Sequence, residues 1–351
     1  MRKENDSLAM LHNKPTIKDV AIQAGVSTST VSHMLNGTRF VSDDVTKRIK
    51  QAIQNLNFKP NPVARSLRSG KSGFIGFIVS NLENYFYLSI AKGIEKTIEA
   101  NGYRLMILDS ADSKEKEMYN VESLFTRGID GLIIAPTYPD FEYLKKVTRP
   151  DYPLVFIDRQ PSNYKADTIL LENVEAAYSA TKYLISMGYK TIGFLAIHFG
   201  VNKMDETIKE RVDGYKLAIK EAGIQNLDNL IKVSAGKAFT MNVLQHVETY
   251  KLTEQLIKQK VQAILCGNSI ATVGTYSYLR DKKIRIPQDV SLITFDDDLW
   301  LRLTTPAISS VVQPAESMGA IAAQRLLRRL EGEDLPFECL RLKAEIILRE
   351  S

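Results

Sequence analysis

The residues best suited to chemistry lie near the N-terminus, within a pattern of small and β-branched residues. Counted from Ile17 as position one, position five is Ala21, position nine is Gly25 and position fifteen is Val31. This spacing is typical of two helices joined by a tight turn, because Ala21 lets them approach and Gly25 can adopt a positive φ. The pattern predicts a helix-turn-helix.

The second helix of this motif, expected at 28–35, carries hydroxyl groups and an imidazole on its outer face. Such side chains suit contacts with base edges and phosphates in the major groove of DNA. A helical hairpin with an ordinary polar face is the alternative interpretation. The candidate DNA-contacting residues of this region are Thr16, Thr28, Ser29, Ser32, His33, Asn36 and Arg39.

The charge is distributed unevenly along the chain. Residues 1–72 hold 12 Lys and Arg against 5 Asp and Glu, whereas the remainder holds 34 against 36. A basic head on a nearly neutral body favours a polyanion as the partner of the head, although a solvated basic tail would show the same charge.

Capping residues delimit three helices in the head. Thr16 is a plausible N-cap with Asp19 in the first turn, Ser27 caps the second helix, and Ser42 is expected to cap the third. Apolar residues of the third helix fall on one stripe, at Val45, Ile49, Ile53 and Leu56. Residues 15–58 are therefore expected to form a compact three-helix domain.

A linker follows at 59–72. Pro60 and Pro62 interrupt the preceding structure, and Pro62 can open a short helix that runs to Arg68. Such a helix has fewer than two turns and is marginal in water without a partner.

From Gly73 onward, apolar strands alternate with segments of helical length. This alternation predicts parallel sheets covered by helices on both faces. Two similar segments, beginning at Gly102 and Gly188, indicate that the same unit is used in two lobes. The expected strands are 74–79, 105–108, 132–135, 154–157, 168–171, 192–196, 263–266 and 290–295. Helices are expected, among others, at 88–100, 115–127, 176–187, 209–222 and 270–282.

Polar and aromatic residues follow several of these strands. Open α/β sheets bind ligands beyond the carboxyl ends of their strands, so these residues are candidates for a binding cleft. Carboxylates accept from hydroxyls, Arg donates in a fork, and aromatic rings cover the C–H faces of sugars. The residues are Tyr85, Phe86, Glu172, Arg211, Asp296 and Trp300.

Composition excludes several classes of protein. The 351 residues contain 44% hydrophobic and 25% charged residues, two cysteines and no apolar run long enough to cross a membrane. The histidines are scattered, and neither a dinucleotide-binding glycine motif nor a Gly-x-Ser-x-Gly elbow occurs. We expect a cytoplasmic protein that is not an enzyme, with no cofactor and no metal.

The chain closely resembles the lactose/galactose repressor family of bacterial transcription regulators. The resemblance rests on residues 16–41 and 60–68 and covers nearly the whole chain. It continues at 128–134, 211–215, 286–296 and 306–314.

The resemblance implies a role for the linker. In the family this segment forms a hinge helix on the operator, paired with that of the dimer mate in the minor groove. Leu67 stands at the position of the wedge leucine, Ala64 allows the hinge helices to pack closely, and Arg68 can meet phosphate.

For the body, residues 73–351, the resemblance implies two lobes of the periplasmic-binding-protein type with an effector in the cleft, and a dimerisation role. Phe86, Arg211 and Asp296 match family ligand positions, whereas Glu172 replaces a more usual Asp or Asn. Asn268-Ser269 departs from the usual Asn-Asp, which removes one carboxylate from the cleft. The expected loop 198–207 is longer than in purine-binding members of the family, so purine contacts are not transferred to it, and Phe239 is added only as a candidate.

The sequence thus predicts a sequence-specific transcriptional regulator, a repressor of a metabolic operon, with an all-α head and a two-lobed α/β body. We expect a homodimer on a palindromic operator, without a tetramerising tail, and a sugar or sugar acid as effector. The alternatives are a nucleobase as effector, a phosphocarrier protein as partner, or a cytoplasmic binding protein that acts through a protein partner.

Overall fold

The computed structural model describes residues 15–59, 71–138, 140–149, 152–198, 205–225, 229–235 and 243–351. The chain divides into two compact units, residues 1–72 and 73–351, and each is described by itself. Within the described residues, no helix is both long and apolar enough to span a membrane.

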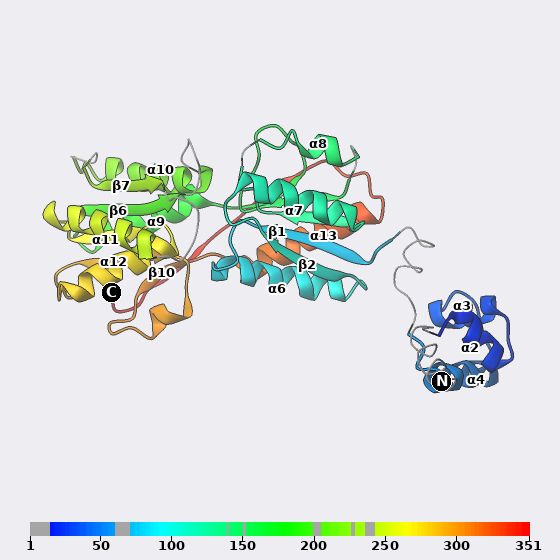
Figure 1. Ribbon diagram of the computed structural model, residues 1–351. Coiled ribbons are helices and arrows are strands. Elements are labelled where there is room, and N and C mark those ends of the chain that lie inside the picture. The colour runs from blue at the N-terminus through cyan, green and yellow to red at the C-terminus, as the bar shows by residue number, and fades with distance from the viewer. Residues whose placement is uncertain are drawn as a thin grey trace, which may run out of the picture. The chain divides into compact units, whose positions relative to one another are not determined.

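The head is a bundle of three helices (Figure 1). These are α2 (Ile17–Ala24), α3 (Thr28–Asn36) and α4 (Asp43–Asn55). Val20, Ala21, Val31 and Ile49 are buried between them, so the small and β-branched positions of the sequence pattern form the core.

The caps of these helices follow the sequence, with one exception. Thr16 and Asp19 form a capping box at the start of α2, and Gly25 ends that helix with a φ of 64°. Ser27 accepts a hydrogen bond from the Thr30 backbone at the start of α3. Ser42 occupies the N-cap position of α4, but its side chain makes no capping hydrogen bond, so that expectation was wrong in detail.

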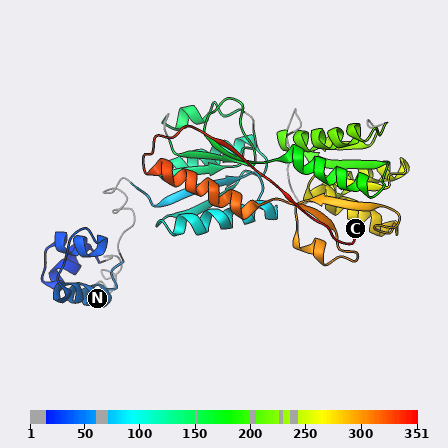
Figure 2. The same ribbon diagram turned by 180° about the vertical axis from the view of Figure 1, so that it is seen from behind.

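The body contains two six-stranded sheets, each at the centre of one lobe (Figures 1 and 2). The first sheet has the order β11-β5-β4-β3-β1-β2 and the second the order β12-β10-β9-β8-β6-β7. Because the first five strands of each lobe follow the same order, each lobe repeats one doubly wound plan.

The strands of the first lobe are β1 (Phe74–Val79), β2 (Arg104–Asp109), β3 (Gly131–Ile134), β4 (Leu154–Ile157), β5 (Asp167–Leu171) and β11 (Cys339–Leu342). Its helices are α6 (Tyr85–Glu99), α7 (Lys114–Thr126), α8 (Leu144–Val147) and α13 (Ala315–Leu330). All pairings in this sheet are parallel, as the sequence predicts.

The strands of the second lobe are β6 (Ile192–His198), β7 (Ile231–Ala235), β8 (Ala263–Cys266), β9 (Ser291–Phe295), β10 (Ser309–Val312) and β12 (Glu345–Ile347). Its helices are α9 (Asn173–Ser186), α10 (Glu206–Glu221), α11 (Val243–Lys258), α12 (Ser269–Asp281) and the 3₁₀ turn η1 (Leu299–Arg302). Here β12 pairs with β10 in the antiparallel sense, which corrects the expectation of purely parallel sheets.

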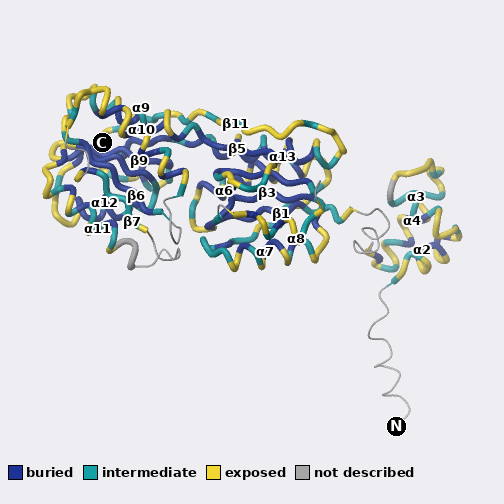
Figure 3. Tube along the Cα trace, turned by 90° about the horizontal axis from the view of Figure 1, so that it is seen from above, coloured by how far each residue is buried: buried dark blue, intermediate teal, exposed yellow. Residues whose placement is uncertain are grey.

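The chain passes between the lobes three times, after β5, after β10 and between β11 and β12. Figure 2 shows the last of these passages as the red segment that runs from one lobe to the other. Figure 3 shows buried strands at the centre of each lobe and exposed residues on the outer helices. This architecture directs the carboxyl ends of both sheets toward the space between the lobes.

Candidate functional site

The outer face of α3 carries the polar residues that the sequence singles out. Thr28 and Ser29 are exposed, whereas Ser32 and His33 are half-buried. The hydroxyl of Ser29 lies 2.7 Å from that of Ser27, and Nδ1 of His33 lies 2.8 Å from the hydroxyl of Thr38. These contacts orient both side chains before any ligand is bound.

The other predicted DNA-contacting residues differ in their position and exposure, and three of them are not described by the structure. Thr16 is exposed, but its hydroxyl donates to Asp19 within the capping box. Arg39 is exposed after α3, and Asn36 is the last residue of that helix. Ala64, Leu67 and Arg68 lie outside the described residues, so their roles stay predictions.

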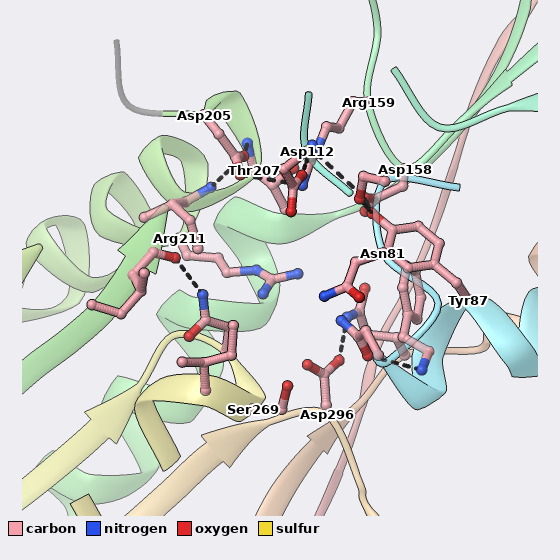
Figure 4. A pocket seen from close by; sticks show the side chains of 18 residues that line it. Asn81, Tyr87, Asp112, Asp158, Arg159, Asp205, Thr207, Arg211, Ser269 and Asp296 are labelled. Atoms are coloured by element: carbon pink, nitrogen blue, oxygen red, sulfur yellow. Dashed lines mark hydrogen bonds and ion pairs between the residues drawn. The ribbon is translucent and has the colours of Figure 1, made fainter. Parts of the chain in front are cut away.

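In the body, a cavity of about 60 Å³ lies between the two lobes (Figure 4). Side chains from both lobes line it, and most of them are polar. From the first lobe come Ser80, Asn81, Asn84, Phe86, Tyr87, Asp112, Asp158 and Arg159. From the second lobe come Ile197, Asp205, Thr207, Ile208, Arg211, Asn268, Ser269, Ile270 and Asp296, and Gln313 joins them from the passage after β10.

Two aspartates line the cavity from equivalent places in the two lobes. Asp158 directly follows β4, Asp296 directly follows β9, and each strand is third in its sheet. Both residues adopt a positive φ, 68° and 71°, a region that Asp tolerates better than most residues. The fold therefore presents one carboxylate from each lobe at the ends of matching strands.

Neighbouring side chains hold these carboxylates in place. The hydroxyl of Tyr87 donates to Asp158 at 2.8 Å, and the amide of Gln313 donates to Asp296 at 2.6 Å. Burial raises the pKa of Asp158 and also the pKa of the Tyr87 hydroxyl.

Arg211 is buried at the second-lobe side of the cavity. Its Nε donates to Asn173 at 2.9 Å, its Nη1 donates to the carbonyl of Gly267 at 2.7 Å, and its guanidinium lies 4.1 Å from the centre of the Phe295 ring. Burial lowers the pKa of Arg211 from its usual value. Figure 4 shows the guanidinium reaching into the cavity from α10.

Arg159 lies at the first-lobe side of the cavity, where three carboxylates surround it. Its nitrogens lie 3.6 Å from Asp112, 3.6 Å from Asp158 and 3.5 Å from Asp205. These distances exceed those of charge-assisted hydrogen bonds, and Nε of Arg159 has no hydrogen-bond partner among the described residues. Burial raises the pKa of Asp112 to about 7, despite the opposing charge of Arg159.

The structure places only some of the predicted effector residues in this cavity. Phe86, Arg211 and Asp296 line the cavity together. Tyr85 is exposed and lines a neighbouring cavity of about 300 Å³, which shares Phe86, Asp296 and Gln313 with the first.

The remaining predicted residues do not line the cavity. Glu172 lies at the N-cap position of α9, in the first passage between the lobes. Trp300 lies in η1, where its ring packs edge-on against Tyr276 at 5.5 Å. Phe239 lies outside the described residues.

Sequence reasoning missed several lining residues, above all Asp158, Arg159 and Asp205. The rule that selected Asp296 also applies to Asp158 and Arg159, because they directly follow the expected strand 154–157. Gln313 follows β10, a strand that the sequence analysis did not identify. Asp205 begins a helix that was expected to start only at Lys209.

Comparison with known proteins agrees with both units of the chain. Residues 16–61 match the family described as "Bacterial regulatory proteins, lacI family", and residues 181–351 match a "Periplasmic binding protein-like domain". Among solved structures, the lac repressor dimer bound to operator and the anti-inducer ONPF superposes with a TM-score of 0.80 at 22% identity. The superposition covers 96% of this chain and 99% of that one, and it shows a shared fold.

Curated relatives match over nearly their whole length. The HTH-type transcriptional repressor PurR of Vibrio atlanticus (strain LGP32) is 32% identical over 96% of this chain and 98% of its own. The HTH-type transcriptional regulator KdgR of Bacillus subtilis (strain 168) is 31% identical, covering 96% and 97%. The ribose operon repressor of Escherichia coli (strain K12) is 30% identical, covering 96% and 99%.

In that solved structure, the lac repressor is a dimer bound to operator and to an anti-inducer. The helix-turn-helix head and the two-lobed body with its polar cleft are the two parts that such control requires. The chain belongs to the lacI family of bacterial regulatory proteins and is a DNA-binding transcriptional regulator under effector control.

Proposed function

We propose that the effector is a sugar, bound through its hydroxyl groups in the cavity between the lobes. The observation that carries this proposal is the alternation of acceptors and donors around the cavity. Asp158 and Asp296 accept, and Arg159 and Arg211 donate. A sugar hydroxyl both donates and accepts, so it can bond to neighbouring groups of either kind.

The apolar part of the lining supports the same ligand class. Phe86 is the one aromatic ring without a hydroxyl among the lining residues, and it can cover one C–H face of a sugar. A nucleobase would favour flat apolar surfaces on both of its faces. The relative from E. coli is named a ribose operon repressor, which agrees with a sugar at this place.

We further propose that α3 reads the operator through Thr28, Ser29, Ser32 and His33. The support is their position on the outer face of the second helix of the motif, which enters the major groove in proteins of this architecture. Asn36 and Arg39 follow directly along the chain.

A thermal-shift screen tests the proposed effector class. Sugars, sugar acids and nucleobases are added separately to the full-length protein. A ligand at one hundred times its Kd stabilises the folded state by about 2.7 kcal/mol, which is readily measured. A sugar is expected to produce this shift, and stabilisation by a nucleobase alone would contradict the proposal.

Calorimetry on two variants then tests the position of the site. Arg211→Gln and Asp296→Asn should each weaken binding of that sugar by about 2–5 kcal/mol, because buried hydrogen-bonding groups lose their partners. Arg280→Gln and Asp281→Asn are matched controls, since this pair lies on the exposed end of α12. Unchanged sugar affinity in both cleft variants would place the site elsewhere.

A further inference from the structure

The cleft contains an ion pair that joins the two lobes directly. Arg159 follows β4 in the first lobe, and Asp205 caps α10 in the second. Nη2 of Arg159 lies 3.5 Å from Oδ2 of Asp205, and the two side chains are only 17% and 13% exposed. Figure 4 shows both residues at the same side of the cavity.

Among the ion pairs of the described residues, two link the lobes. The other is Arg341–Glu210, with a shortest distance of 2.8 Å. Arg341 belongs to β11, which leads directly into the last passage between the lobes. That pair therefore lies beside a connection that joins the lobes in any case, whereas Arg159 and Asp205 meet across the cleft itself.

We propose that Arg159 and Asp205 form a latch that holds the lobes closed over the cleft when no effector is bound. Asp112 and Asp158 keep the guanidinium on the first-lobe side, at 3.6 Å each, so that it faces Asp205. This inference rests on the proposed effector site only for its consequence, which is that a sugar in the cleft competes with Asp205 for Arg159.

The lining of the cavity supports this consequence. Arg159 and Asp205 both line it, together with Asp158 and Arg211, which are proposed to bind the sugar. A sugar hydroxyl that accepts a hydrogen bond from Arg159 competes with Asp205 for the same guanidinium. Binding of the sugar therefore weakens the contact between Arg159 and Asp205.

The energetics suit a reversible contact. In the closed cleft, the attraction between the charges is largely offset by the loss of their hydration. When the lobes separate, water hydrates both groups again, so neither charge is left buried without a partner. A contact of this kind biases the closed state without locking it.

The two carboxylate oxygens of Asp205 have separate tasks, which makes a clean test possible. Oδ1 accepts hydrogen bonds from the backbone of Thr207 at 2.8 Å and of Ile208 at 3.3 Å, and so caps α10. Oδ2 faces Arg159. Asparagine also caps helices well, so Asp205→Asn removes the charge of the latch and keeps the cap.

The experiment measures the distance between the lobes in the full-length protein without effector. Spin labels are attached to cysteines introduced at Tyr119 in α7 and Asp213 in α10, both exposed, with the exposed Cys339 replaced by Ser. Labelled protein is diluted with unlabelled protein so that a dimer carries one labelled subunit. Pulsed electron paramagnetic resonance then reports the populations of closed and open lobes.

Asp205→Asn is expected to raise the ratio of open to closed molecules roughly fivefold, the factor that corresponds to about 1 kcal/mol. Glu206→Gln is the matched control, because Glu206 is the next residue and pairs with Lys209 within α10. It should leave the distance distribution unchanged.

Arg159→Gln provides the second test. It should open the cleft at least as far as Asp205→Asn, because it removes the ion pair and also leaves Asp112 and Asp158 facing Asp205 without a positive charge between them. Adding Asp205→Asn to Arg159→Gln should open the cleft no further, because the ion pair is already absent. An unaltered distribution in Asp205→Asn, or additive opening in the double variant, would overturn the latch. Since no effector is present, these outcomes are independent of whether a sugar binds.

Discussion

At the scale of single residues, α3 carries short polar side chains that can contact the edges of bases. We predict that Ser29→Ala and His33→Ala each weaken operator binding by roughly 1–3 kcal/mol and leave binding to random DNA almost unchanged. The contact between His33 and Thr38 fixes the imidazole, so its other ring nitrogen is presented in a defined direction. Titrations on operator and random duplexes check this, and equal losses on both would show that neither residue reads bases.

Glu117 is a buried acid that makes stability depend on pH. Its carboxylate accepts from the backbone of Thr137 at 2.6 Å and from the hydroxyl of Tyr143 at 2.9 Å, and burial raises its pKa from 4.5 to about 7. Between these two values the folded state keeps a proton that the unfolded state releases. The contribution of Glu117 is therefore complete at low pH and is lost as the pH rises through this window.

Glu117→Gln should remove that dependence, because the amide does not titrate. Urea unfolding at pH 5, 6, 7 and 8 gives the free energy of unfolding of both proteins. The advantage of the wild type over the variant should shrink as the pH rises, by at most about 1.4 kcal/mol per pH unit up to pH 7. A constant difference across the series would mean that Glu117 is charged throughout.

At the scale of elements, two helices of the first lobe touch through glycine. A Cβ on Gly93 of α6 would lie 2.0 Å from the carbonyl oxygen of Glu316, and one on Gly319 of α13 would lie 2.1 Å from that of Ile90. Since these neighbours are backbone atoms, the helices must separate to admit a methyl group. Gly319→Ala should lower the free energy of unfolding by about 1–3 kcal/mol.

Chemical denaturation of full-length variants measures this effect. Gln324→Ala is the control, because Gln324 lies on the exposed face of the same helix. It should change the free energy of unfolding by no more than about 0.5 kcal/mol. Equal stability of Gly319→Ala and the wild type would mean that the two helices can separate without loss.

Element prediction from sequence succeeded where local signals decide the structure. The capping box of Thr16 and the left-handed Gly25 follow from residue types that favour those conformations. Strands β7, β10, β11 and β12 were missed. Of these, β11 and β12 are short and partly exposed and have no buried run to mark them. Their partners β5 and β10 are distant in sequence, and only the assembled sheets specify these pairings.

At the scale of the whole molecule, the sequence predicts those cleft residues that have a local signal, but not the contacts between the two lobes. Phe86, Arg211 and Asp296 were within reach of sequence reasoning, because each lies near the end of a strand or the start of a helix. The approach of Arg159 to Asp205 has no local signal, since the two residues belong to different lobes. The distance between them depends on how the three connecting segments place one lobe relative to the other.

The division of charge between the two units leads to a prediction for the whole chain. Residues 1–72 carry the excess of Lys and Arg, and the body is nearly neutral. We therefore expect DNA affinity and its salt dependence to reside in the head, because neutralised phosphates release counterions. A dimer that neutralises roughly six phosphates loses about 10³-fold in affinity between 50 and 200 mM salt.

A fragment of residues 73–351 tests this expectation, because the body is a compact unit with its own buried cores. The fragment should lose operator binding and should still be stabilised by the same sugar as the full-length protein. Operator titrations at several salt concentrations, together with thermal shifts, compare the two proteins. If the fragment bound DNA with the salt dependence of the full chain, the body would contribute phosphate contacts, and the head would not be the sole source of the electrostatic affinity.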